Sequence, residues 1–129
     1  MRILCVAVAL VLTAIPAQAD VSITISKASQ QMAVSVDAGP PMVWTVSTGR
    51  DGYNTPTGSF RAIRLEEVYF SKKYDDAPMP NSVFFTNTGV AFHQGSLTER
   101  SAGCIHLSKK SSTVFFDKLQ VGDEVQVVP

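Results

Sequence analysis

Two short segments of the sequence carry the residues best suited to chemistry. Cys104 follows Gly103 and precedes an apolar residue, and His93 ends an apolar run earlier in the chain. A thiol is mostly protonated near neutral pH, and an imidazole beside it can take its proton and leave the more nucleophilic thiolate. The pair therefore predicts a cysteine nucleophile with a histidine base, as acyl transfer requires. Taken alone, His93 fits a hydrogen-bonded structural histidine better.

The residues around the pair suit the later steps of acyl transfer. The backbone N–H groups of Gly103 and Cys104 are expected to form an oxyanion hole, and glycine lets the backbone come close to a substrate. No Asp or Asn nearby is an obvious group to orient His93, so we expect a backbone carbonyl in that role. Together with His106 the pair gives one Cys and two His, but without a recognisable zinc-ligand spacing. Neither a metal nor another cofactor is expected.

The start of the chain has the pattern of a secretory signal peptide. Met1-Arg2 is followed by an apolar run to Ile15, then by Pro16 and the small-residue motif Ala17-Gln18-Ala19. The run is shorter than the roughly 20 residues that span a bilayer, so no stable membrane insertion is expected after cleavage. The expected domains are a signal peptide at 1–19 and one catalytic domain at 20–129.

Cleavage would leave Cys104 as the sole thiol of the exported protein, since Cys5 lies in the signal peptide. In an oxidising compartment an unpaired cysteine is a reactive thiol, one half of an intermolecular bridge, or a buried inert residue. The cysteine count does not choose among these. Loss of Arg2 would leave acidic residues in excess by one, with the basic residues scattered, so a nucleic-acid partner is not expected.

The elements that must position these residues are mostly strands. Alternating or β-rich apolar segments predict strands at 21–25, 32–36, 42–47, 59–65, 83–85, 90–93 and 125–128. Ser108 suits the N-cap of one helix, which Gly122 is expected to end. Residues 66–82 show no clean period and predict an ordered excursion over the site. The expected fold class is mainly β, a barrel or sandwich of mixed sheets with one short helix after Cys104.

Several motifs resemble the L,D-transpeptidase catalytic domain (YkuD) family. Ser101-Ala102-Gly103-Cys104-Ile105, with His93 upstream, is similar to the family's nucleophile and base motifs. The other similar segments are Trp44-Thr45-Val46-Ser47-Thr48-Gly49-Arg50, Thr55-Pro56-Thr57-Gly58-Ser59-Phe60, Lys73-Tyr74-Asp75-Asp76-Ala77-Pro78-Met79-Pro80 and Val121-Gly122-Asp123-Glu124-Val125. The likeness covers nearly all of the expected exported chain.

This resemblance implies a role for each matching residue. Cys104 would be the nucleophile and His93 the base, with the backbone carbonyl of Gln94 orienting the His93 ring. Gly103 would form the oxyanion hole together with the Cys104 N–H, and Ser101 would support the loop.

Four further positions bear on substrate binding. Tyr74 and Pro78 would contact substrate from a lid over the site. Ala102 stands where the family usually has His, and His106 stands where Arg or Asn is common. These two departures bear on the reaction more than on the fold.

The resemblance also implies an L,D-transpeptidase that acts on peptidoglycan stem peptides in the periplasm or at the cell wall. A tetrapeptide stem would be the acyl donor, and the amine of a neighbouring diamino acid or of a protein the acceptor. A lid that excludes water would favour the amine. The alternative is a cysteine hydrolase on the same scaffold, which trims stem peptides or releases wall-linked proteins. A non-catalytic wall-binding module is the third interpretation.

Overall fold

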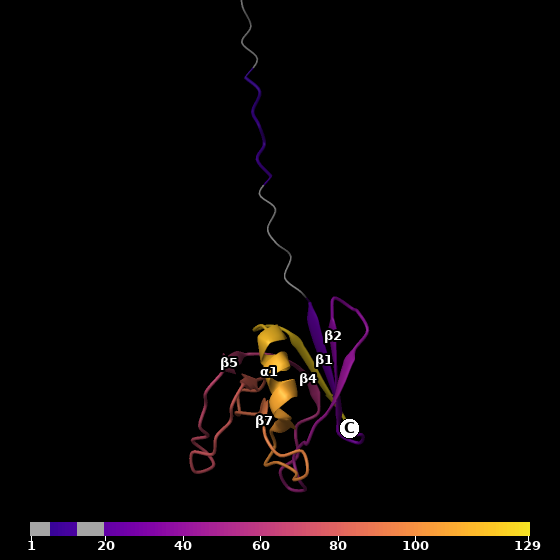
Figure 1. The fold of residues 1–129 in the computed structure, drawn as a ribbon, viewed down its shortest axis with the longest axis vertical. Helices are drawn as coiled ribbons and strands as arrows, with labels where there is room; N and C mark the ends of the chain where they lie inside the picture. Colours follow the sequence, from indigo (N-terminus) through magenta and orange to yellow (C-terminus); the bar gives the residue numbers. More distant parts are fainter. Residues whose placement is uncertain (1–5, 13–19) are drawn as a thin grey trace, which may run out of the picture.

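Two β-sheets pack around a shared apolar core in the computed structural model, which describes residues 6–12 and 20–129 (Figure 1). The strand order is β3-β2-β1-β9-β4 in the first sheet and β5-β6-β7-β8 in the second. Both sheets are mixed, because β1 runs parallel to β9 and β7 runs parallel to β8. The expected fold class, mainly β with mixed sheets and one short helix, is confirmed.

The first sheet follows from alternation of apolar and polar residues. Along β1 the side chains of Val21, Ile23 and Ile25 are buried, and the residues between them face outward. The same period recurs in the strands beside it. The strands are β1 (Val21–Ser26), β2 (Gln31–Val36), β3 (Met42–Thr45), β4 (Gly58–Arg61) and β9 (Glu124–Val128).

The second sheet is built from short strands, of which β6, β7 and β8 are largely buried and β5 is not. Its members are β5 (Arg64–Glu66), β6 (Ser82–Phe84), β7 (Ala91–Gln94) and β8 (Ile105–Leu107). The expected pair at 83–85 and 90–93 is present as antiparallel β6 and β7. Strand β8 was not predicted, because three residues are too few to show a period.

The single strand predicted at 59–65 is wrong. The structure has two strands there, β4 and β5, which belong to different sheets. Two successive residues explain the break: the Ala62 N–H donates to Asp123 O at 2.9 Å, and the Ile63 N–H donates to Phe84 O at 2.7 Å. The chain crosses from one sheet to the other at this point.

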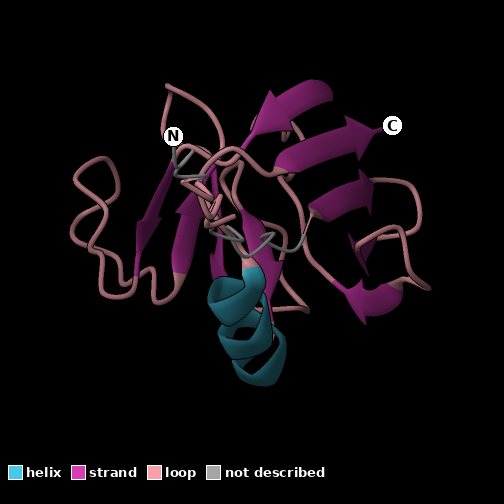
Figure 2. Cartoon of the chain, turned by 90° about the horizontal axis from the view of Figure 1, so that it is seen from above, coloured by secondary structure: helices cyan, strands magenta, loops and turns pink. Residues whose placement is uncertain are grey.

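Helix α1 (Lys109–Lys118) links the two sheets (Figure 2). Its expected N-cap is present, since the Ser108 hydroxyl accepts from the Ser111 N–H at 3.0 Å. The helix stops at Leu119, before the expected Gly122, which lies in the turn toward β9 with φ +98°. The ring of Phe115 lies 4.8 Å from that of Phe92 in the second sheet and 6.4 Å from that of Trp44 in the first.

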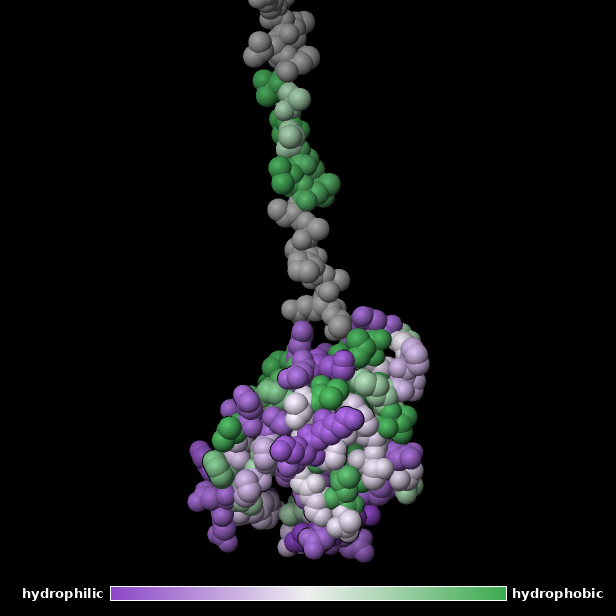
Figure 3. Space-filling model, in the orientation of Figure 1, coloured by the Kyte–Doolittle hydropathy of each residue, from purple (hydrophilic) through white to green (hydrophobic). Residues whose placement is uncertain are grey.

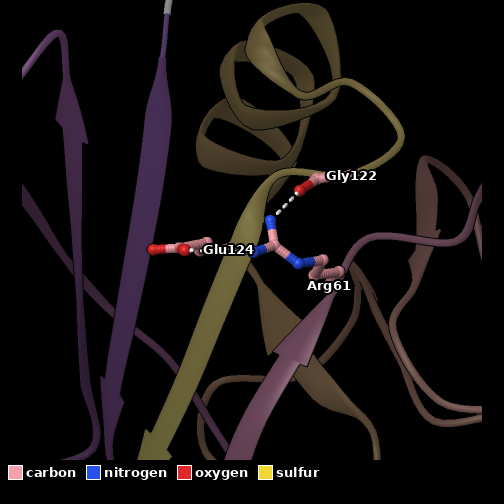
Figure 4. A network of polar contacts seen from close by, with 3 residues as sticks. All are labelled: Arg61, Gly122 and Glu124. Atoms are coloured by element: carbon pink, nitrogen blue, oxygen red, sulfur yellow. Dashed lines mark hydrogen bonds and ion pairs between the residues drawn. The ribbon is translucent and has the colours of Figure 1, made fainter.

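An exposed polar network joins β4 to β9 at the edge of the first sheet (Figure 4). Arg61 donates to Gly122 O at 2.9 Å and pairs with Glu124 at 3.3 Å. Both charged side chains are more than half exposed, so the pair contributes about 1 kcal/mol or less.

The predicted signal peptide at 1–19 lies largely outside the described residues and stays a prediction. Of it, residues 6–12 are described, without regular secondary structure, as an apolar stretch (Figure 3). Within the described part of the chain, no helix is long and apolar enough to cross a membrane.

Candidate active site

The parallel pairing of β7 with β8 brings Cys104 and His93 to one face of the second sheet. His93 on β7 lies opposite His106 on β8, and Phe92 lies opposite Ile105, which directly follows Cys104. Phe92 and Ile105 are buried in the core. Because side chains alternate along a strand, His93, His106 and Cys104 project to the other face.

The segment between β5 and β6, residues 67–81, covers this face, and we call it the lid. It is the long loop at the lower left of Figure 1, and a notch separates it from the body of the protein in Figure 3. A cavity of about 280 Å³ lies beneath it, lined by Cys104, His93, His106 and the lid residues Tyr74 and Pro78 among others. The structure therefore brings the expected catalytic pair and both expected lid residues to one cavity.

His93 is held as a neutral imidazole. Its side chain is buried, and Nδ1 lies 2.8 Å from Gln94 O, the carbonyl expected to orient it. A carbonyl can only accept, so Nδ1 carries the proton and Nε2 keeps a free lone pair. Burial lowers the pKa of His93 to about 4, against the opposing effect of the Gln94 hydrogen bond. The ring is therefore in its basic form at neutral pH.

Cys104 is half-buried and rests as a thiol. Burial raises its pKa, while a backbone hydrogen bond from Ala91 and the charge of Lys73 act in the opposite direction. Its Sγ lies 3.9 Å from Gly89 O, and within the described residues no hydrogen bond joins it to His93. The resting pair is a neutral thiol and a neutral imidazole, so a thiolate at Cys104 requires that the thiol proton be transferred to a base.

The turn that carries Cys104 is fixed by Ser101 and a glycine. Gly103 has φ +125°, a conformation that favours glycine. The buried Ser101 hydroxyl donates to Cys104 O and accepts from the Gly103 N–H at 3.1 Å. The Ser101 hydroxyl thus joins both residues of the turn, and the Gly103 N–H, one of the two expected oxyanion donors, has this hydroxyl as its acceptor in the structure. The Cys104 N–H makes no hydrogen bond to the described residues and is the free donor here.

Thr55 is a residue of the site that the sequence did not single out. Its side chain is fully buried, and its hydroxyl donates to Gly103 O at 2.7 Å and accepts from the Gly49 N–H at 3.0 Å. Thr55 thereby ties the strand-loop segment after β3 to the Cys104 turn. In the sequence it belongs to one of the segments that resemble the family, with no role of its own.

His106 packs against His93. Its ring lies 4.7 Å from that of His93, and its Nδ1 lies 3.0 Å from Ser96 O. Burial lowers the pKa of His106. A Cβ on Gly95 would lie 2.6 Å from the His106 Cγ, so the ring needs glycine there. The position where Arg or Asn is common thus holds a neutral ring rather than a permanent cation.

Two other positions complete the site. Ala102 lines the 280 Å³ cavity and also a neighbouring cavity of about 470 Å³. Arg100, which had no sequence signal, donates to Thr48 O at 3.2 Å and to Gly49 O at 3.2 Å. These bonds join Arg100, just before the Cys104 turn, to the segment after β3.

The fold and the site together define a class of protein. It is a β-domain in which a cysteine and a histidine lie on one face of a sheet that the lid covers. The family model of the L,D-transpeptidase catalytic domain matches residues 20–127. The chain belongs to this family. No curated protein sequence matches it.

Solved structures of L,D-transpeptidases share the fold. The enzyme from Stackebrandtia nassauensis is 28% identical with a TM-score of 0.78, and the match covers 88% of this chain and 57% of that one. The enzyme from Mycobacterium smegmatis is 25% identical with a TM-score of 0.78 and coverage of 86% and 59%. L,D-transpeptidase 3 from Mycobacterium tuberculosis, in complex with a faropenem-derived adduct, is 25% identical with a TM-score of 0.76 and coverage of 86% and 61%. The chain spans about three fifths of the length of these proteins.

Proposed function

We propose that this protein is an L,D-transpeptidase that forms an acyl-enzyme on Cys104 from a peptidoglycan stem peptide. The observation that carries the proposal is the shared cavity of Cys104 and His93 under the lid, in a chain of this family. The tetrapeptide donor, the amine acceptor and the absence of any cofactor in the reaction are parts of the same proposal.

The proposed chemistry uses the neutral pair that the site holds at rest. His93 Nε2 takes the thiol proton as Sγ attacks the donor carbonyl, and the Cys104 N–H donates to the oxyanion. The C–N bond then breaks, and His93 returns the proton to the departing amine. In the second half the acceptor amine attacks the thioester, His93 takes its proton, and the thiol is released.

A hydrolase on the same scaffold is the second candidate, and Ala102 favours it. Ala102 lines both the cavity beside Cys104 and the neighbouring 470 Å³ cavity, and its small side chain shields this side of a thioester from water less than the usual His would. In that case water replaces the amine in the second half-reaction.

The test is incubation of the purified protein with a disaccharide-tetrapeptide, with products measured by mass spectrometry. Cross-linked dimers support transpeptidation, and trimmed monomers support hydrolysis. A faropenem adduct on the protein, absent in Cys104→Ala and formed more slowly in His93→Gln, supports the assigned nucleophile and base. An unmodified protein and unchanged substrate would contradict both candidates and favour a wall-binding module.

Export to the periplasm or cell wall is also proposed, and it rests on the signal peptide pattern at 1–19. The mass of the protein recovered from the periplasmic fraction should correspond to a chain that begins at Asp20. Recovery of the full-length mass from the cytoplasm would contradict export.

A further inference from the structure

Two cavities open on Cys104, and they differ in charge. The 280 Å³ cavity that also holds His93 and His106 has no Lys, Arg, Asp or Glu among its described lining residues. A second cavity, of about 260 Å³, also has Cys104 in its lining, together with Arg64, Lys72 and Lys73. No carboxylate lines this second cavity within the described part of the chain. We call it the cationic cavity.

The two lysines of the cationic cavity have no acidic partner. Arg64 is paired with Glu66 at 3.7 Å, and both side chains are about half exposed, so the pair neutralises it only weakly. The Arg64 guanidinium also lies 4.2 Å from the centre of the Phe84 ring. Among the described residues, neither Lys72 nor Lys73 forms an ion pair. Their positive charge is therefore available to an anion that enters the cavity.

Of the three basic residues of the cationic cavity, Lys73 also lines a second cavity at the site. It lines the cationic cavity together with Cys104, and it lines the 470 Å³ cavity together with Ala102 and Gly103. Its Nζ lies 5.5 Å from the centre of the Tyr74 ring, which also lines both cavities. Its charge is felt at the nucleophile, since it opposes the rise in the pKa of Cys104 that burial causes.

We propose that the cationic cavity binds a free carboxylate of the acyl donor, and that Lys73 is the residue that selects it. His106 is not a permanent cation, whereas Lys72 and Lys73 of the lid are, so the lid supplies the positive charge in this cavity. The uncharged cavity beside His93 is then left for the amine acceptor, whose proton the neutral base must take. The identity of the donor rests on the proposed function, but the electrostatic selection does not.

The first test measures the charge at Cys104 without any peptidoglycan. Iodoacetate, an anion, and iodoacetamide, its neutral analogue, both alkylate the thiolate: a C–S bond forms and iodide leaves. The ratio of their rates cancels the thiol pKa and reports the local field. Lys73→Met should lower the iodoacetate-to-iodoacetamide ratio about fivefold, as expected for loss of one nearby charge at intermediate dielectric. Lys73→Arg should preserve it.

The matched control is Lys110→Met, an exposed lysine of α1 away from the cavity. It should leave the ratio unchanged. An unchanged ratio in Lys73→Met, or an equal fall in Lys110→Met, would overturn the proposal.

The second test asks whether the cavity serves the acyl donor. With a disaccharide-tetrapeptide donor, Lys73→Met should raise KM about fivefold at nearly constant kcat. A donor whose carboxylates are amidated should show no difference between the wild type and Lys73→Met. A lower alkylation ratio with the same donor KM would overturn the carboxylate assignment. If the wild type processes no donor at all, the transpeptidase proposal fails while the alkylation ratio still decides the electrostatic one.

Discussion

The two walls of the site hold their shape in different ways. The floor, residues 47–55 and 95–106, is joined by hydrogen bonds between segments far apart in the sequence. Thr55 bonds Gly103, and Arg100 bonds Thr48. Thr48 and Thr55 are fully buried and Arg100 is exposed, so the Thr55 bond in particular satisfies groups that have no access to water.

The lid is bonded mainly to itself. Met79 N–H donates to Tyr69 O at 2.8 Å, and Ser71 N–H donates to Ala77 O at 2.9 Å. Tyr69 and Met79 face inward, but Val68 is 72% exposed and Phe70 is 55% exposed. Changes in the floor should therefore alter both the global stability and the geometry of the site. Changes in the lid should alter ligand binding with little effect on global stability.

The largest effect should come from acid, through His93 on β7, next to the floor. Its folded pKa of about 4 lies below the unfolded value of 6.5, so the unfolded state binds more protons between these pH values. The stability that His93 contributes is complete above pH 6.5 and is lost as pH falls toward 4, by roughly 3 kcal/mol. Urea unfolding at pH 7 and pH 4 measures this.

His93→Gln is the control for that loss. It should flatten most of the dependence and leave the smaller part that His106, whose pKa is also lowered, contributes in the same direction. The acid limb of acylation by faropenem should likewise fall near pH 4. If the rate of acylation instead falls near pH 6.5, the His93 ring is exposed to water. The packing around it is then looser than the contacts in the structure indicate.

Thr55→Val should have the next largest effect. It removes a buried hydroxyl and leaves the Gly49 N–H without its acceptor and Gly103 O without its donor. We expect a loss of about 2 kcal/mol in unfolding free energy and slower adduct formation at Cys104. Thr57→Val, at an exposed threonine two residues further on, should change neither quantity. Equal effects of the two variants would remove the distinction between a cross-linked floor and an ordinary loop.

Gly95→Ala tests the packing of the floor against His106. The new Cβ would lie 2.6 Å from the His106 ring, and the ring must shift away from Ser96. Such overpacking costs about 1 kcal/mol or more. In a double-mutant cycle measured by urea unfolding, the two substitutions should be coupled. The double variant Gly95→Ala/His106→Ala should lose less unfolding free energy than the sum of the losses in the two single variants. Additive losses would mean that the ring is not what excludes a side chain at position 95.

The sequence predicted the elements that a local pattern dictates. The N-cap at Ser108 and the alternation of β1 and β2 are features of a few adjacent residues, and the structure has them. The sequence did not predict the features that depend on contacts between residues far apart in the chain. Strand β8 exists because β7 lies beside it, and the chain from β4 to β5 divides because Ala62 and Ile63 pair with different sheets.

The features of the candidate site also divide into those that the local sequence shows and those that depend on contacts between distant segments. Cys104 and His93 were recognisable by residue type and motif. The acceptor of the Gly103 N–H, the two bonds of Thr55 and the position of Lys73 beside Cys104 were not, because each depends on how separate segments meet. In the sequence Lys72 and Lys73 are two of the scattered basic residues, and only the structure shows that they line a cavity with Cys104.

The smallest effect should come from the outer face of the lid. Phe70→Ser removes an aromatic ring that is mostly exposed, so the unfolding free energy should change by no more than about 0.5 kcal/mol. Phe85→Ser, at a buried ring 4.9 Å from Phe92 in the core, is the contrast and should cost several kcal/mol. Urea unfolding of both variants, with amide hydrogen exchange of the wild type, measures the difference. Exchange should be faster across residues 67–81 than across 47–55, because the lid's bonds can open without breaking those of the floor. Equal protection, together with a large loss in Phe70→Ser, would show that the lid unfolds only with the rest of the protein and is as firmly held as the floor.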